Sequence, residues 1–192
     1  MSAPRGFLAD RGGTAAIEFA MIAVPFIGLI AAIFETGAIY FRTAQLQVTT
    51  ETASRGVLTR SLSAGKTYQQ FIDESVCTHQ TPPNVVKPGT LSTMFDCNKV
   101  MVDIRAAGTW SSANLLNDFY TAPPSKSSAI PLPSAGQIAI VRIAYPMPAA
   151  TAIITGGVFS GQSIGSTRAG QVQYDSKWTY MLLGVYAFRV EP

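Results

Sequence analysis

The stretch GGTAAIEFAMIAVPFIGLIAAIFETGAIYF, from Gly12 to Phe41, decides how this chain is built. From Thr14 onward it carries only two charged residues, Glu18 and Glu35. A helix of this length, rising 1.5 Å per residue, covers roughly 40 Å, whereas the hydrocarbon core of a bilayer is about 30 Å thick. We therefore predict a transmembrane helix over residues 14–41, with a buried helix of a soluble protein as the alternative.

Pro25 lies inside this predicted span. A proline has no backbone N–H, so it removes the hydrogen bond to the carbonyl of Met21 and is expected to kink the helix. Prolines are also common in membrane helices, so a proline without a special role is the alternative.

After Phe41 the sequence becomes polar but keeps small and apolar side chains at helical spacing. These side chains fall near one face of a helix. They are Leu46, Thr50, Ala53, Val57 and Leu62. We predict that the helix continues out of the bilayer to about Ser63 and packs this face against a globular domain.

The rest of the chain predicts a small antiparallel sheet. Strands are expected over Asn98–Ala106, Ile138–Tyr145 and Tyr180–Val190, with a fourth over Val172–Trp178 as an option, and a short helix over Tyr68–Cys77. In the first strand, the face that carries Met101, Asp103 and Arg105 is expected to be exposed to solvent. The second strand is expected to end at Pro146 and Pro148. The predicted fold class is α+β, with a long N-terminal helix continuing into a domain of three or four strands.

The chain has two cysteines, Cys77 and Cys97. If the domain is delivered across a membrane, it meets an oxidising compartment, where two cysteines tend to form a disulfide. We predict a disulfide between them; closing a loop of this length is worth about 3 kcal/mol by the chain-entropy estimate. Two free buried thiols are the first alternative. A zinc site with His79 is the second, although the paired spacing of structural zinc sites is missing. We expect no metal and no cofactor.

Composition and charge argue against nucleic-acid binding and give no support to catalysis. Only 13% of the residues are charged, the formal net charge is +3, and the basic residues are scattered singly. The single histidine, His79, has no evident catalytic partner in the sequence, and no phosphate-binding glycine loop is present. We predict that the protein is not an enzyme, with a membrane-anchored periplasmic enzyme as the alternative.

The residues in front of the span suggest proteolytic processing. Arg5 and Arg11 precede Gly12 and Gly13, and Glu18 and Phe19 follow four uncharged residues later. A carboxylate near the start of a membrane span is costly, so its presence indicates a role. The order resembles the processing site of type IV prepilins and pseudopilins, in which a membrane peptidase cuts after a glycine and leaves a glutamate at the fifth mature position.

That resemblance implies a basic leader over residues 1–13, cleaved between Gly13 and Thr14, with Glu18 as the fifth mature residue. Phe19 follows Glu18 directly, and the apolar run begins there. A glutamate that only reaches the headgroup level of the bilayer is the alternative.

A narrower resemblance comes from both ends of the chain. The segments IEFAMIAVPFIGLIAAIFETG, GQIAIVRIAYPMP (Gly136–Pro148) and VYAFRVEP (Val185–Pro192) resemble TadE-like pilus assembly proteins, minor pseudopilins of the tight-adherence (Flp) pilus system. The family implies membrane lipid, a prepilin peptidase, other pilins and pseudopilins, and the inner-membrane pilus assembly platform as partners. A single-span envelope protein with a periplasmic binding or enzymatic domain, not processed, is the alternative.

The resemblance implies the bacterial inner membrane or the pilus itself as the location. The N-terminus is expected in the cytoplasm and residues 42–192 in the periplasm. Counting Lys and Arg on the two sides of the span leans against this orientation, since Arg42, Arg55 and Arg60 follow it. The cysteine pair and the prepilin-like site favour it.

Overall fold

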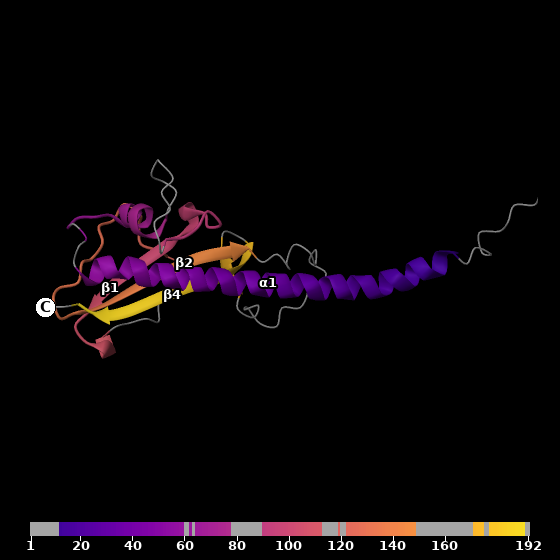
Figure 1. Ribbon diagram of the computed structural model, residues 1–192. Helices are drawn as coiled ribbons and strands as arrows, with labels where there is room; N and C mark the ends of the chain where they lie inside the picture. Colours follow the sequence, from indigo (N-terminus) through magenta and orange to yellow (C-terminus); the bar gives the residue numbers. More distant parts are fainter. Residues whose placement is uncertain are drawn as a thin grey trace, which may run out of the picture. The chain divides into compact units, whose positions relative to one another are not determined.

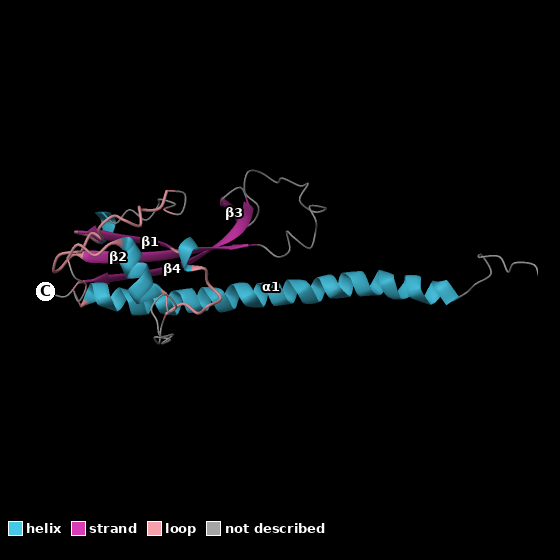
Figure 2. Cartoon of the chain, turned by 90° about the horizontal axis from the view of Figure 1, so that it is seen from above, coloured by secondary structure: helices cyan, strands magenta, loops and turns pink. Residues whose placement is uncertain are grey.

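The computed structural model of this chain describes residues 12–59, 62, 64–77, 90–112, 119, 122–148, 171–174 and 177–190. It has an α+β fold made of one long helix, α1, and a four-stranded sheet (Figures 1 and 2). The chain divides into two compact units, residues 1–38 and residues 39–192, and each is described by itself. Residues 1–11 of the expected leader lie outside the described residues.

Helix α1 runs from Gly12 to Leu58 and includes Pro25. The prediction that it reaches Ser63 was wrong by about one turn. Thr59 still donates its N–H to the Arg55 carbonyl at 2.9 Å, but Gly65 adopts φ +82° and Thr67 forms a β-bridge with Ala129. The chain must leave the helix to make this bridge, and a glycine is suited to the left-handed turn that it needs.

The sheet has the strand order β1-β2-β4-β3, and all neighbours are antiparallel. Its strands are β1 (Met101–Ala107), β2 (Ile138–Pro148), β3 (Gln171–Tyr174) and β4 (Lys177–Arg189). The three strands expected from the sequence are confirmed, although the first begins at Met101 rather than Asn98, because Cys97–Lys99 form a 3-10 turn. The optional fourth is split, because its first part forms β3 while Lys177 and Trp178 already belong to β4.

Strand β2 continues through Pro146 and Pro148, so the prediction that these prolines end it was wrong. A proline disrupts a sheet only where its missing N–H would have bonded a neighbouring strand. Backbone groups alternate sides along an antiparallel strand. Val185, opposite Arg142, bonds the Gln47 side chain with its N–H and C=O and so turns them away from β2; the backbone positions of Arg142, Pro146 and Pro148 therefore turn toward β1. Pairing with β1 stops at Met101↔Ala144, so neither proline removes a ladder hydrogen bond.

The face predicted for α1 is the face that packs on the sheet. Leu46, Thr50, Ala53 and Val57 are 0–4% exposed, and the apolar ones among them join the side chains of the strands in one hydrophobic cluster. The strand residues that alternate onto this side include Val102, Ile104, Ala139, Val141, Ile143, Tyr145 and Leu182. Burial of this apolar surface holds the second half of α1 on the domain, at about 25 cal/mol per Å².

The opposite face of β1 is buried rather than wet, contrary to the prediction. Met101 is 5% exposed and Asp103 4%, while Arg105 is partly buried. A second small cluster formed by Met101, Phe119 and Ala144 covers this side. The covering residues come from elsewhere in the chain, so the alternation within one strand does not reveal them.

The predicted short helix is confirmed as α2 (Tyr68–Phe71), followed by a π-helical turn over Ile72–Val76. Its first turn has a reciprocal capping box, in which the Thr67 hydroxyl accepts from the Gln70 N–H and the Gln70 side chain accepts from the Thr67 N–H. The turn ends at Cys77, which forms the predicted disulfide with Cys97 at a Cα–Cα distance of 6.3 Å. The alternatives of two free thiols and a zinc–thiolate site are therefore wrong.

Candidate membrane-anchoring and processing site

The first part of α1 exposes large apolar side chains on every side. Phe19, Met21 and Phe34 are 74–75% exposed, and Ile22 and Val24 are 71–72% exposed. A helix that packs on a soluble domain shows an apolar stripe, whereas a helix that is apolar all round requires an apolar environment around it. Leaving such side chains in water costs about 1.5–3 kcal/mol each relative to burial.

Within the described residues, α1 is the helix whose length and composition suffice to cross a membrane. The candidate segment is Thr14–Leu58, with a mean hydropathy of 2.4 in its most apolar window, and none of that window is buried inside the protein. The described part of the chain therefore has one candidate membrane span, as the sequence predicted. Its orientation and the position of the lipid boundary stay predictions.

The residues of the expected processing site lie at the start of α1. The helix assignment begins at Gly12, so Gly13 is in the first turn, and Thr14, Glu18 and Phe19 are exposed. Thr14 and Glu18 are four residues apart, so they share one face of the helix. Each glycine costs a helix about 1 kcal/mol relative to alanine, so Gly12 and Gly13 weaken this first turn.

Pro25 does not interrupt the assigned helix, and the kink expected there stays a prediction. Gly28 and Gly37 have open space around them, because a Cβ added at either position would meet no atom within 4 Å. These small residues leave the backbone of α1 accessible on those sides.

A buried ion pair, not expected from the sequence, lies between neighbouring strands of the sheet. Asp103 and Arg142 are each 4% exposed and are directly opposite in the β1–β2 register. Arg142 donates from Nε to Asp103 Oδ2 at 2.9 Å and also from its terminal NH2 group, and Arg105 Nε donates to the same oxygen at 3.0 Å. The Arg142 guanidinium lies 4.6 Å from the ring centre of Phe119.

This cluster has a structural character. The Asp103 carboxylate is engaged by two guanidinium groups and is buried, so it is poorly placed to contact a substrate. One feature of the sequence indicates this ion pair: Arg142 interrupts an otherwise apolar strand. An arginine that is buried needs a nearby carboxylate. The sequence does not say which carboxylate supplies it.

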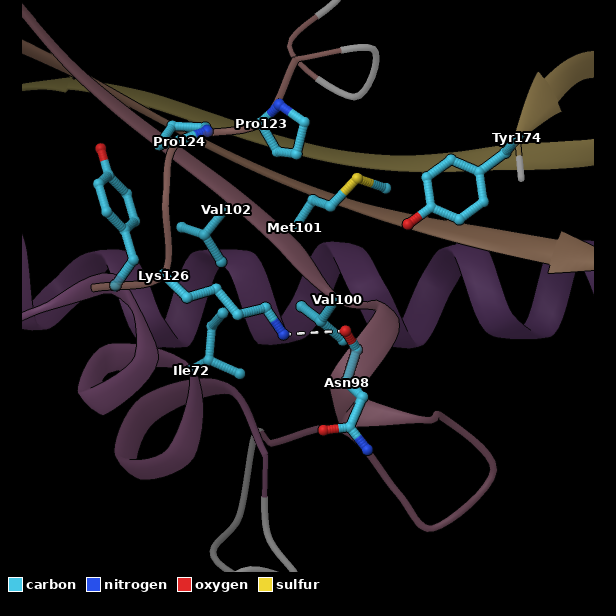
Figure 3. A pocket seen from close by; sticks show the side chains of 10 residues that line it. Ile72, Asn98, Val100, Met101, Val102, Pro123, Pro124, Lys126 and Tyr174 are labelled. Carbon is cyan, nitrogen blue, oxygen red and sulfur yellow. Dashed lines mark hydrogen bonds between the residues drawn. The ribbon is translucent and has the colours of Figure 1, made fainter. Parts of the chain in front are cut away.

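A small cavity of about 100 Å³ lies beside β1 and the first turn of α2 (Figure 3). Apolar side chains form most of its wall: Ile72, Val100, Met101, Val102, Pro123 and Pro124. Lys126 Nζ donates to the backbone carbonyl of Asn98 at 2.8 Å, and the Tyr68 hydroxyl donates to the Ile104 carbonyl at 3.5 Å. Burial raises the pKa of Tyr68, so this hydroxyl stays protonated at neutral pH.

The Lys126 ammonium and the Tyr68 hydroxyl at this cavity are thus each engaged by a backbone carbonyl. In the residues that the structure describes, no group of three or more His, Cys, Asp or Glu side chains is placed to hold a metal ion. His79 lies outside them. The feature of the described chain with the clearest functional character is therefore the exposed apolar half of α1.

The class of protein defined by these observations is an α+β domain joined to a helix that is able to span a membrane. Within this class, the family model of TadE-like proteins matches residues 13–55. The match confirms the resemblance expected from the sequence, and it covers most of α1. No curated protein and no solved structure matched the chain.

Proposed function

We propose that this chain is a minor pseudopilin that takes part in assembling the tight-adherence (Flp) pilus. One observation carries the proposal: the TadE-like match begins at Gly13, in the first turn of a helix that exposes apolar side chains on every side. A processed pseudopilin would retain the part of α1 that follows Gly13. The role is one of membrane anchoring and assembly rather than catalysis.

The proposal divides the chain into a leader of residues 1–13, a membrane span of residues 14–41 and a periplasmic domain of residues 42–192. The disulfide between Cys77 and Cys97 supports the periplasmic placement, since such bonds persist in oxidising compartments. The N-terminus is then in the cytoplasm. The chain resides in the bacterial inner membrane or, after assembly, in the pilus.

Four kinds of partner follow from this role. Membrane lipid surrounds the exposed apolar side chains of α1. A prepilin peptidase removes the leader, other pilins and pseudopilins pack beside the span, and the inner-membrane platform drives assembly. The last three are carried over from the TadE-like resemblance.

Replacing Gly13 by valine should leave the full-length precursor in the membrane. A branched side chain beside the cleaved bond is too large for a subsite that accepts glycine. Gly12→Val is the matched control, because it changes the adjacent glycine and should still be cut. Mass spectrometry of the membrane-extracted chain, from cells with an active prepilin peptidase, reads the N-terminus directly.

Two results would contradict the proposal. Wild-type chain that retains residues 1–13 in such cells would favour the alternative, an unprocessed single-span envelope protein with a periplasmic binding or enzymatic domain. Equal cleavage of the Gly13→Val and wild-type chains would place the cut elsewhere.

Replacing Glu18 by glutamine should leave cleavage intact but reduce the number of pili severalfold. After cleavage, Thr14 carries a free α-amino group one helical turn before Glu18, at the edge of the bilayer. An ammonium group that leaves water without a partner is costly, and a carboxylate from the same or a neighbouring subunit offsets that cost. Glutamine keeps the shape and removes the charge.

Glu51→Gln is the matched control for this variant, since Glu51 lies further along α1 and forms an exposed ion pair with Arg55 one turn away. Such exposed pairs contribute little to stability. Pili counted by electron microscopy and the mass of the processed chain are the two readouts. Normal piliation of Glu18→Gln would show that Glu18 merely lies at the headgroup level. Loss of cleavage would assign its role to peptidase recognition.

A further inference from the structure

Strand β4 begins on the side of its contact with α1 that lies toward Phe41, the last residue of the predicted membrane span. The strand runs in the same direction as α1, because its arrow in Figure 1 points toward the magenta, C-terminal end of the helix. Gly184 packs against Leu46 and Thr50 of α1, and this contact relates the two elements. The start of β4, at Lys177, therefore lies on the Phe41 side of the contact. All of these residues belong to one compact unit, residues 39–192.

The strand between this contact and the start of β4 is longer than the helix between the contact and Phe41. Gly184 is seven residues from Lys177, which is roughly 23 Å of extended chain. Leu46 and Thr50 are five and nine residues from Phe41, which is about 8–14 Å of helix. The strand thus reaches the level of Phe41 even where it crosses the helix obliquely. Strand β3, which pairs with the first four residues of β4, reaches the same level.

This end of the sheet has the residue types that membrane surfaces favour. The sequence over residues 174–180 is YDSKWTY, and the strand register pairs Tyr174 with Lys177. Trp178 follows on β4, and both Tyr174 and Tyr180 are partly exposed. Trp and Tyr are enriched at the boundary between lipid and water, because each combines an apolar ring with one polar group. Lysine can extend its ammonium group to the lipid headgroups.

Helix α1 has residues of the same kind at this level. Tyr40 is 73% exposed and Phe41 55%, and Arg42 follows them. These two aromatic side chains continue the exposed apolar surface of the predicted span, which requires an apolar environment. Two elements of the unit over residues 39–192 therefore carry interfacial residue types at one level.

We infer that the β3–β4 end of the sheet, at Tyr174 and Lys177–Tyr180, is a second membrane contact that lies in the headgroup region of the bilayer. Its partner is the lipid surface, because this end of the sheet lies level with the residues at which α1 enters the lipid. A contact beside the helix limits how far the domain can tilt on its anchor. The inference rests on the membrane span of the proposed function, but not on leader cleavage or on a role in the pilus.

The two tryptophans of the chain test this inference, because they lie at opposite ends of the sheet. Trp178 is at the start of β4. Trp110 follows the end of β1, which runs in the same direction as β4 because each is antiparallel to β2. Trp110→Phe leaves Trp178 as the only tryptophan, and Trp178→Phe, the matched control, leaves Trp110. Both variants keep an aromatic ring at the changed position.

Each full-length variant is reconstituted into phosphatidylcholine vesicles, with or without bromine atoms on the acyl chains close to the headgroup. Bromine quenches tryptophan fluorescence only at short range, so a tryptophan that it quenches lies at the lipid. We expect the brominated lipid to lower the fluorescence of Trp178 severalfold and to leave that of Trp110 almost unchanged. Bromine placed deeper along the acyl chains should quench Trp178 less.

Alkaline extraction of the same vesicles shows separately whether α1 is inserted. A chain that is extracted would contradict the membrane span, and this inference would fall with it. A chain that stays inserted, with Trp178 quenched no more than Trp110, would overturn this inference alone.

Two further results would also overturn it. Stronger quenching of Trp178 by the deeper bromine atoms would place this end of the sheet in the hydrocarbon core rather than among the headgroups. Protection of Trp178 from both brominated lipid and aqueous iodide would show that protein, rather than lipid, covers it.

Discussion

Replacing Asp103 by alanine should lower the free energy of unfolding by about 3–5 kcal/mol, the range for breaking one side of a buried ion pair. Arg142 is 4% exposed, so its guanidinium cannot reach water without a change in the fold. Without the carboxylate, Arg142 and Arg105 also place two positive charges on the same face of the sheet. The stacking of Arg142 on Phe119 does not replace the lost negative charge.

Chemical unfolding of the detergent-solubilised chain, followed by tryptophan fluorescence, measures this loss. The double variant Asp103→Leu with Arg142→Met is the informative companion, because it replaces the pair by apolar side chains and leaves no buried charge between these two positions. It should be markedly more stable than Asp103→Ala. An Asp103→Ala chain as stable as wild type would show that Arg142 has another sufficient partner.

Replacing Gly184 by valine should cost about 3 kcal/mol, at the upper end of the range for overpacking. A Cβ at this position would lie 3.0 Å from the Leu46 carbonyl oxygen of α1 and would overlap the Thr50 hydroxyl. Thr50 is fully buried and donates that hydroxyl to the Leu46 carbonyl at 2.7 Å, so it has no room to move. The helix backbone itself must therefore shift away from β4.

Gly108→Val is the matched control, since a Cβ added there would meet no atom within 4 Å. The smaller change Gly184→Ala should be partly rescued by Thr50→Ala, which removes the overlapping oxygen, and a double-mutant cycle measures that coupling. The same unfolding experiment serves all of these variants. Additive losses from Gly184→Ala and Thr50→Ala would show that the two residues do not limit the approach of α1 to the sheet.

The sequence by itself determined the membrane-competent helix, the α+β class, three of the strands and the cysteine pair. These features are local or depend on simple periodicity. The exposed apolar half of α1 follows from composition, and the buried face from Leu46 to Val57 follows from helical spacing. The partners of the disulfide follow from the cysteine count, because the chain contains only two cysteines.

Only the tertiary structure decided the contacts that depend on strand register and on residues far apart in the chain. Asp103 meets Arg142 because β1 and β2 pair in one particular register. Strand β2 runs through Pro146 because β1 ends before it on that side, which the sequence of β2 does not encode. Gln47 meets Val185, 138 positions away, because the close approach of α1 at Gly184 brings the helix to the edge of β4. Each of these contacts is set by how elements pack together, whereas periodicity reports only which face of a single element is buried.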